Sequence, residues 1–163
     1  AMRRGYTAAQ YLAAVERARA ALDQLAITTD VIVGFPGETD VRFEESLALC
    51  KHVGFSRLHV FAFSPRPGTP AALMGGQVDG TVVAERRERM RRLGERMAIA
   101  FHRSFLGQRV EVLAERVRQG EASGYSRHYV PVAFPADAAV QGHVVAVEAT
   151  GADAAGISGT KSL

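Results

Sequence analysis

The chain has 163 residues, of which 47% are hydrophobic, and its formal net charge is +3 at pH 7. This length suffices for one medium-sized domain or two small ones with a buried core. No apolar run approaches the roughly 20 residues that cross a bilayer, and the amino terminus lacks a signal-peptide layout, so a cytoplasmic protein without a membrane partner is expected. The single cysteine, Cys50, excludes an internal disulfide and a cysteine-ligated metal site formed by this chain alone.

Positive charge is concentrated in one stretch. Residues 81–106 carry seven basic and three acidic side chains, whereas the rest of the chain is close to neutral. Affinity for nucleic acid that comes from phosphate contacts needs several clustered Lys or Arg side chains. The charge alone therefore predicts only a modest attraction to nucleic acid.

The first predicted element is a helix over residues 8–25. Thr7 followed by Gln10 has the spacing of a capping box, and apolar side chains then recur at helical spacing. We expect this helix to be part of the scaffold. A second helix is predicted to begin after Thr39 and to end at Gly54, with Cys50 as a small core residue rather than a reactive thiol.

Between these helices, residues 28–39 read TTDVIVGFPGET and predict a strand that runs into a tight turn. The β-branched residues at 31–33 favour a strand covered on both faces, as in a parallel sheet wrapped by helices. In such sheets ligands bind at the carboxyl ends of the strands, where this turn lies. Gly34 would let a ligand approach the backbone, and Glu38 and Asp40 would place negative charge at the start of the next helix. An ordinary strand-to-helix turn without a ligand fits the same spacing.

A second strand is predicted over residues 57–63, as the parallel neighbour of the first. We expect His59 within it to be a core histidine with at most an indirect role in a site. The strand leads into a Pro- and Gly-rich loop, residues 64–77, and loops of this length in compact domains tend to be functional. Arg66 is the only charged side chain of this loop and lies between two prolines. This arrangement fits a cation presented to an anionic ligand, and it also fits a solvated arginine.

A long helix is predicted over residues 82–106, with apolar side chains inward and most arginines outward. The outward set comprises Arg86, Arg87, Arg89, Arg92, Arg96 and Arg103. Such a face is usually only solvated, although it could flank RNA.

After Gly107 the hydrophobic period changes to two, which predicts a small all-β domain. Strands are expected over RVEVLAERV, SGYSRHYVPVAF and GHVVAVEA. On the second of these, Tyr125, Arg127 and Tyr129 would share one face, an aromatic and basic set of the kind that binds single-stranded RNA. With Arg116 they are the candidate RNA-binding residues, and cross-strand packing of the two tyrosines is the alternative. Residues 151–163 lack periodicity and are expected to be a disordered tail.

These motifs occur together in one known family. The run DVIVGFPGET, the phrase GFSRLHVF, the loop SPRPGTPA, the arginine-rich helix ending in SFLG and the later GYSRHYV resemble, in the same order, the carboxyl-terminal part of the radical-SAM methylthiotransferases. The resemblance implies an α/β fold class: a partial (β/α) radical-SAM barrel over residues 1–106, then a small TRAM-like β-barrel over residues 107–150. It also implies an enzyme that, at full length, uses S-adenosylmethionine and [4Fe-4S] clusters to add a methylthio group to a tRNA adenosine beside the anticodon.

The resemblance also implies roles for single residues. The strand after Asp30 matches the family element that lies along the adenine of S-adenosylmethionine. The end of the next strand, at Phe63 and Ser64, matches the position whose backbone meets the adenine edge, and Arg66 is expected at the mouth of the active site. The implied cofactor-binding residues are Asp30, Ile32, Gly34, Phe63, Ser64 and Arg66.

The substrate implied by the resemblance is a tRNA nucleoside. Arg66 with Gly68, Thr69 and Ala71 resembles the branch that acts on tRNA rather than the branch that acts on a ribosomal protein. The phrase FSRLHVF resembles enzymes that act on C2 of N6-threonylcarbamoyladenosine. The isopentenyladenosine branch is the alternative.

The chain departs from the family in one large respect, because the CxxxCxxC loop that binds a cluster has no counterpart. A thiolate-ligated cluster needs several cysteines and this chain has one. We therefore expect a fragment that is inactive alone, holds no metal, and pairs through exposed sheet edges with the missing amino-terminal part of the same enzyme. Two other classes stay open: a non-catalytic RNA-binding module over residues 107–150, and a different α/β-barrel enzyme with a phosphate-bearing ligand.

Overall fold

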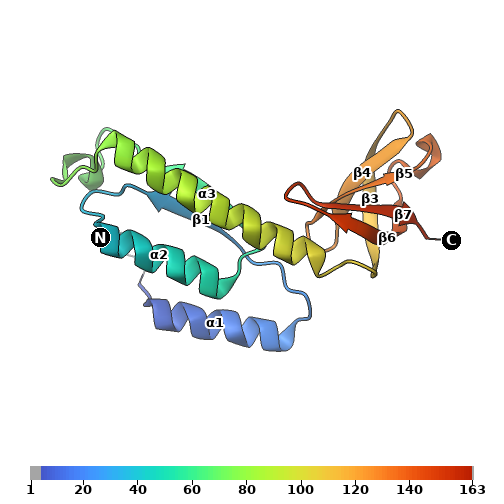
Figure 1. Cartoon of the computed structure of the whole chain (residues 1–163), viewed down its shortest axis with the longest axis horizontal. Helices are drawn as coiled ribbons and strands as arrows, with labels where there is room; N and C mark the ends of the chain where they lie inside the picture. The colour runs from blue at the N-terminus through green and yellow to red at the C-terminus, as the bar shows by residue number, and fades with distance from the viewer. Residues whose placement is uncertain (1–4, 163) are drawn as a thin grey trace. The chain divides into compact units, whose positions relative to one another are not determined.

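The computed structural model describes residues 5–162, which divide into two units (Figure 1). The first unit extends to Gly94 and the second begins at Glu95, so the division lies inside the long helix α3 (Gly80–Arg103). The sequence suggests a boundary after residue 106. The difference arises because Phe101 and Phe105, at the end of the helix and just beyond it, pack with the core of the second unit.

The first unit is built around two parallel strands. It contains α1 (Ala8–Ala21), β1 (Thr28–Val33), α2 (Asp40–Val53), β2 (Arg57–Ala62), the 3-10 helix η1 (Pro70–Leu73) and the first part of α3. Strands β1 and β2 pair in parallel from Thr28 opposite Arg57 to Val33 opposite Ala62, and α2 connects them. The predicted βαβ unit is therefore confirmed.

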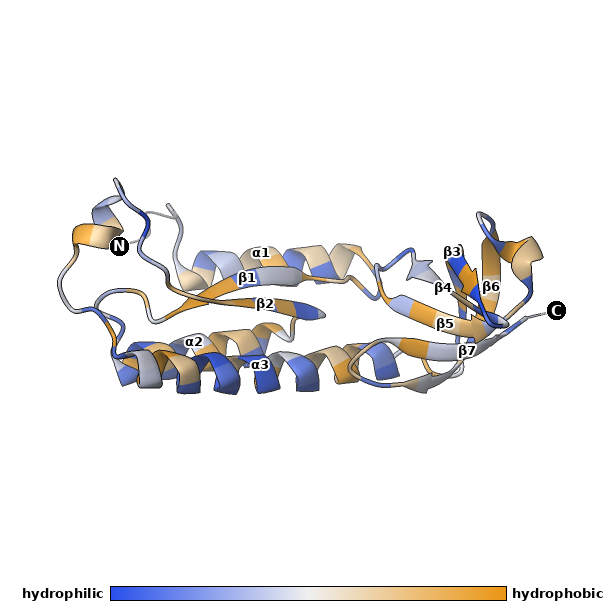
Figure 2. Cartoon of the chain, turned by 90° about the horizontal axis from the view of Figure 1, so that it is seen from above, coloured by the Kyte–Doolittle hydropathy of each residue, from blue (hydrophilic) through white to orange (hydrophobic). Residues whose placement is uncertain are grey.

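One face of this sheet is open. Helices α2 and α3 lie on the same side of the strands (Figure 2), where Val33 is buried. On the other face Ile32 and Phe61 are 41% and 52% exposed. The prediction of strands buried on both faces is therefore wrong for this chain, because helices within it cover only one face.

The ends of the helices follow the sequence signals closely. Thr7 and Gln10 form the expected capping box at α1, and Thr39 caps α2 through a hydrogen bond that its hydroxyl accepts from the backbone N–H of Arg42. Gly54 ends α2 in the left-handed conformation, with φ of 61°. Helix α1 ends at Ala21 rather than at residue 25, because the backbone is already extended at the following residue.

The second unit is a closed barrel of five strands. These are β3 (Arg109–Arg118), β4 (Glu121–Ser126), β5 (Pro131–Pro135), β6 (Val144–Ala152) and β7 (Ile157–Lys161), and η2 (Ala138–Val140) is a short 3-10 helix before β6. Their order around the barrel is β3-β4-β5-β7-β6. Buried positions alternate with exposed or half-buried ones along the strands, except in β3 beyond Ala114. The fully buried core includes Phe105, Val112, Val132, Phe134 and Val147. A mixed α/β chain with a small β-barrel is thus confirmed.

Two details of the barrel correct the sequence analysis. The stretch expected to be one strand, SGYSRHYVPVAF, is two strands, β4 and β5, joined by a turn over residues 127–130. The expected disordered tail instead completes the barrel, since β6 continues to Ala152 and β7 pairs with both β5 and β6. Close packing of β6 against β7 explains why residues 151–163 lack an alternating apolar pattern. A Cβ on Gly159 would lie 2.3 Å from the carbonyl oxygen of Glu148, so this position has no room for a side chain.

None of the helices within residues 5–162 combines the length and the hydrophobicity that crossing a membrane requires.

Candidate functional site

The loops that follow β1 and β2 meet at one edge of the sheet. The backbone N–H of Phe63 donates to the carbonyl oxygen of Val33 at 2.8 Å, and the rings of Phe35 and Phe63 pack edge to face with centroids 5.2 Å apart. Further along, the N–H of Gly37 donates to the carbonyl oxygen of Gly76 at 2.8 Å. The expectation that the Gly-Phe-Pro-Gly turn and the long loop share the carboxyl edge is confirmed.

Gly34 is required at this edge by the protein itself. Its φ is +75°, and a Cβ there would lie 2.5 Å from Cγ2 of Val83 on α3. Its N–H donates to Oε2 of Glu38 at 2.8 Å. From the sequence alone, this glycine is explained by a ligand that approaches the backbone. In the structure it is the side chain of Val83 that lies close to Gly34.

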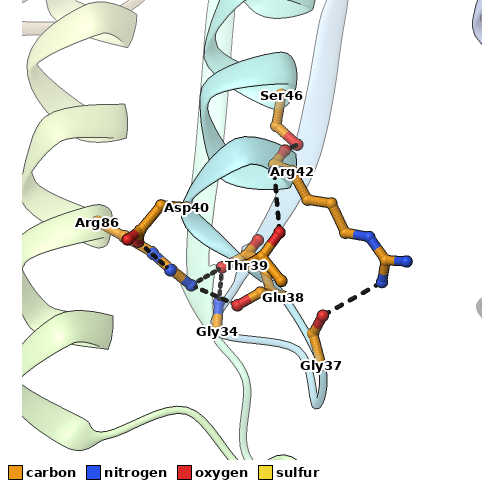
Figure 3. Close-up of polar contacts among 8 residues, drawn as sticks. All are labelled: Gly34, Gly37, Glu38, Thr39, Asp40, Arg42, Ser46 and Arg86. Carbon is orange, nitrogen blue, oxygen red and sulfur yellow. Dashed lines mark hydrogen bonds and ion pairs between the residues drawn. The ribbon is translucent and has the colours of Figure 1, made fainter.

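A buried arginine ties α3 to the same turn (Figure 3). Arg86 is 5% exposed, and its Nη1 donates to Oε2 of Glu38 at 2.8 Å and to the carbonyl oxygen of Glu38 at 3.0 Å. Its Nη2 donates to Oδ1 of Asp40 at 2.6 Å. The hydrogen bond to Asp40 raises the pKa of Arg86, and the bond and charge of Glu38 add to this, against the opposing effect of burial. The prediction that Arg86 points outward with the other arginines is wrong, since Glu38 and Asp40 provide a paired site for it inside the fold.

Two of the implied cofactor residues lie on the open face of the sheet. Asp30 and Ile32 are exposed, and they pair in register with His59 and Phe61 of β2, which are also exposed. The expectation of a core histidine at position 59 is therefore wrong. The open face carries a carboxylate beside an imidazole, followed toward the carboxyl edge by an aliphatic and an aromatic side chain.

The remaining implied cofactor residues lie in the loop after β2. Phe63 is half-buried, and Ser64 and Arg66 are exposed. The carbonyl oxygen of Arg66 accepts hydrogen bonds from the N–H and hydroxyl of Thr69, at 3.2 and 2.8 Å. Gly68 has a φ of +81°, so residues 66–69 form a tight turn with the Arg66 side chain at its start.

On the barrel, two of the four candidate RNA-binding residues line one groove. Arg116 and Tyr125 both contribute to a groove of about 530 Å³ that extends over β3, β4, β5 and the start of β7. Tyr125 is 41% exposed and lies opposite Leu113 and Pro131 in the sheet. Tyr125 therefore has neighbours to pack against across the sheet and also exposes part of its side chain to solvent.

The other two candidates lie on the turn between β4 and β5. Arg127 is exposed, and Tyr129 is 84% exposed with a φ of +56°, which is uncommon for a tyrosine. The buried hydroxyl of Ser126 holds this turn by accepting hydrogen bonds from the N–H groups of His128 and Val130, each at 3.3 Å. Tyr125, Arg127 and Tyr129 therefore do not share one strand face.

The described residues include no candidate metal site. Within residues 5–162 no group of three or more His, Cys, Asp or Glu side chains is arranged to hold a metal ion. Cys50 is buried, and burial raises the pKa of its thiol to about 11. Its prediction as a core residue is confirmed.

Comparison with known proteins identifies the relatives of the chain. No protein-family model matches it. It is 48% identical over 74% of its length to a tRNA-2-methylthio-N(6)-dimethylallyladenosine synthase of Frankia alni, and 40% identical over 99% of its length to the enzyme of the same name in Chloroflexus aurantiacus. It is also 39% identical over 90% of its length to the threonylcarbamoyladenosine tRNA methylthiotransferase MtaB of Thermotoga maritima.

The chain spans only 24%, 36% and 34% of the length of these three relatives. The identities are nevertheless high and extend over most of the chain in each case. The homologues of this chain are tRNA methylthiotransferases, and the region that it matches is their carboxyl-terminal part.

Proposed function

We propose that the chain is the carboxyl-terminal portion of a radical-SAM tRNA methylthiotransferase. The observation that carries the proposal is the shared edge where the loops after β1 and β2 meet, beside an open sheet face, in a chain whose relatives are tRNA methylthiotransferases. In α/β folds that edge is where ligands bind. The missing amino-terminal part of the enzyme would cover the open face and pair with the exposed strand edges.

The residues at this edge fit the adenosyl part of S-adenosylmethionine. Ile32 and Phe61 present exposed apolar surface to a flat ring, while Asp30 and His59 supply polar groups on the same face. Phe63 and Ser64 lie where the second loop begins, and Arg66 stands on a fixed turn beyond them. In this class of enzyme S-adenosylmethionine supplies the radical that abstracts hydrogen, and the protein orients it. The role of these residues is to bind and position the nucleoside.

The residues do not fit an iron–sulfur cluster. The one cysteine of the chain is buried, and the raised pKa of its thiol disfavours the thiolate form that ligates iron. Any cluster of the whole enzyme would be held by the missing part. We therefore expect the chain alone to be inactive.

The barrel is the proposed tRNA-binding part, a role that corresponds to a TRAM domain. Arg116 and Tyr125 in the groove, with Arg127 and Tyr129 on the turn, would contact the anticodon arm. The relatives' names point to two possible modified nucleosides, a dimethylallyladenosine and a threonylcarbamoyladenosine. Both stay candidates for the substrate.

A chimeric enzyme tests this proposal. The homologous region of the Chloroflexus aurantiacus relative, which aligns with 99% of this chain, is replaced by the chain itself. The chimera is expected to add methylthio groups to tRNA, measured by mass spectrometry of digested nucleosides with each of the two candidate tRNAs. The unmodified host enzyme is the positive control. A folded chimera that binds tRNA and S-adenosylmethionine but makes no product with either tRNA would contradict the proposal.

A matched pair of chimeras tests the edge. Arg66→Ala is expected to lower product formation if Arg66 lies at the mouth of the site, whereas Arg17→Ala, at an exposed arginine of α1, should have a smaller effect. Equal turnover in the Arg66→Ala chimera and its parent would make the loop a structural element only.

The alternative is a non-catalytic RNA-binding module. The closed barrel with its groove favours this function independently of the first unit. It predicts RNA binding by the chain together with an inactive chimera.

A further inference from the structure

The groove on the barrel owes its shape to the register of four strands. Arg116 of β3 lies opposite Ser123 of β4, Ser123 lies opposite Ala133 of β5, and Ala133 lies opposite Ser158 of β7. Three consecutive positions across the sheet thus carry short side chains. All three line a groove on the outside of the barrel, where their short side chains leave room for a ligand.

A β-bulge places the cation of the groove. Pairing of β3 with β4 shifts register between Ala114 and Arg116, so that Glu115 and Arg116 are both exposed. Strict alternation from the buried Val112 and Ala114 would turn Arg116 into the barrel core. The bulge instead directs its guanidinium to the groove.

Gly124 shows that the bulge is built into the fold. A Cβ at this position would lie 1.8 Å from the carbonyl oxygen of Leu113 and 3.1 Å from the nitrogen of Glu115. Only glycine fits opposite the bulged backbone. The outward direction of Arg116 therefore follows from local structure on two strands.

The rim of the groove combines an aromatic ring with carboxylates. Tyr125 lies one alternation beyond Ser123 on the same face of β4, beside Pro131 of β5. On the far side, Oδ1 of Asp153 accepts hydrogen bonds from the N–H groups of Ala155 and Gly156, at 2.7 and 3.1 Å. The carboxylate of Asp153 thus stabilises a turn. The residue Glu115, which also lines the groove, is exposed.

The chemistry of this set selects one kind of ligand. A tyrosine ring with an exposed surface stacks on a nucleobase, an arginine binds its phosphate, and a carboxylate accepts hydrogen bonds from ring or exocyclic N–H groups. A continuous row of phosphates would be repelled by Glu115 and Asp153. The volume of about 530 Å³ falls within the range of roughly 300–1,000 Å³ that is usual for sites of small ligands.

We propose that this groove binds a single unpaired nucleotide of the RNA, with its base stacked on Tyr125, its phosphate on Arg116 and its amino edge toward Glu115. A paired base cannot reach the ring, because both of its faces are covered by neighbouring bases in the duplex. This inference rests on the proposed function of the barrel in binding tRNA. It goes beyond that function by naming the ligand of one site and the role of each side chain.

The test measures binding of the intact chain to a fluorescently labelled anticodon stem-loop RNA and to a fully paired duplex of the same length. The stem-loop is expected to bind more tightly than the duplex. Tyr125→Ala should weaken stem-loop binding about 5- to 100-fold, and Tyr125→Phe should retain it, because stacking needs the ring and not the hydroxyl. Glu115→Gln keeps the size of the side chain and should change the preference among loop sequences.

Arg116 is tested by its salt dependence. Loss of one phosphate contact to a single strand should reduce the slope of log affinity against log salt concentration by about 0.7 in Arg116→Ala. The matched control is Arg109→Ala, an exposed arginine on the same strand that does not line this groove. Tyr6→Ala, at a 53% exposed tyrosine of the first unit, is the control for Tyr125.

The possible outcomes separate the inference from the function on which it rests. If the chain binds neither RNA, the proposed RNA-binding function fails. If it binds both RNAs equally, or if a folded Tyr125→Ala variant keeps full affinity while Tyr129→Ala loses it, RNA binding stands but the groove is not the nucleotide site. Circular dichroism and thermal unfolding of each variant show whether a loss of binding reflects a loss of fold.

Discussion

Arg86 and Glu38 are 48 positions apart in the chain, and their side chains meet at 2.8 Å in a site where both are largely buried. The same carboxylate oxygen accepts the N–H of Gly34, so one acidic side chain joins the end of β1 to α3. The opposite end of the guanidinium bonds to Asp40, which is almost fully exposed. Arg86 therefore holds the turn at the proposed cofactor edge from a helix that is remote in sequence.

Arg86→Met is expected to destabilise the first unit by about 2–4 kcal/mol, because it leaves the buried carboxylate of Glu38 without its cation. Urea unfolding followed by circular dichroism measures the loss. Hydrogen exchange at the Gly34 amide should accelerate, since its acceptor is no longer held in place. Arg86→Lys should recover little of the stability that Arg86→Met loses, because one ammonium group cannot replace the hydrogen bonds of the guanidinium to both Glu38 and Asp40.

Arg89→Met is the matched control for this prediction. Its guanidinium pairs with Glu44 at 2.5 Å, but the two side chains are 44% and 55% exposed. Such a pair contributes less than about 1 kcal/mol. Equal losses in the two variants would mean that the burial of Arg86 has no energetic importance.

Gly34→Ala tests the contact between the turn and α3. The alanine would have to adopt a positive φ and its Cβ would overlap with Val83, so the expected loss of stability is roughly 2–4 kcal/mol. Gly37→Ala is the control, because Gly37 has a similar φ of +78° and no atom within 4 Å of the added Cβ. It should cost about 1 kcal/mol from backbone strain alone. If both variants lose the same stability in urea unfolding, the contact with Val83 is not what demands glycine.

Local signals in the sequence predicted much of the first unit. The capping box at Thr7, the N-cap at Thr39 and the end of α2 at Gly54 are set by short-range hydrogen bonds and backbone conformation, so they can be read from neighbouring residues. The parallel pairing of β1 with β2 follows from the length of the connecting helix. The shared edge of the two loops follows in turn from that pairing.

Long-range contacts explain what the sequence left out. The burial of Arg86 depends on a carboxylate 48 positions away. Its position four and seven residues before the buried Met90 and Leu93 places it on the inner face of α3, but the helix alone does not reveal the partner that allows a charged side chain to be buried there. The β-bulge could have been predicted from the sequence. Glu115 and Arg116 are consecutive charged residues at a point where strict alternation would turn one of them into the barrel core. Strand β7 gave no such signal, because its Gly159 is required by the close approach of β6 and adds no side chain to a hydrophobic face.

Tyr129→Asn should change stability and RNA affinity in opposite directions. Asparagine adopts a positive φ more readily than tyrosine, so the barrel is expected to gain about 0.5–1 kcal/mol in thermal or urea unfolding. RNA affinity should fall, because the most exposed tyrosine of the barrel is lost. Functional sites often retain such strain.

Gln119→Asn is the control for the opposite changes in stability and RNA affinity that are expected of Tyr129→Asn. Gln119 also has a positive φ, of 51°, in the turn between β3 and β4, and it is followed by Gly120 at +81°. Asparagine followed by glycine is the favoured pair for such a hairpin turn, so stability should rise. RNA affinity should stay the same. A fall in RNA affinity in this variant as well would assign the effect to the turns in general and not to the ring of Tyr129.

The thiol of Cys50 predicts a loss of stability at alkaline pH. Burial raises its pKa from 9.0 to about 11, so the folded state binds the proton more tightly than the unfolded state does. Its contribution is fully present below pH 9 and is lost as the pH rises from about 9 to about 11. The loss should reach up to about 2 kcal/mol in urea unfolding. Burial also raises the pKa of Tyr11, which adds a loss of the same sign at higher pH, so the measurement needs a variant. In Cys50→Ala the contribution of the thiol is absent. The difference in the free energy of unfolding between the parent and this variant should therefore shrink as the pH rises from about 9 to about 11. A difference that stays constant would show that the thiol does not ionise on unfolding.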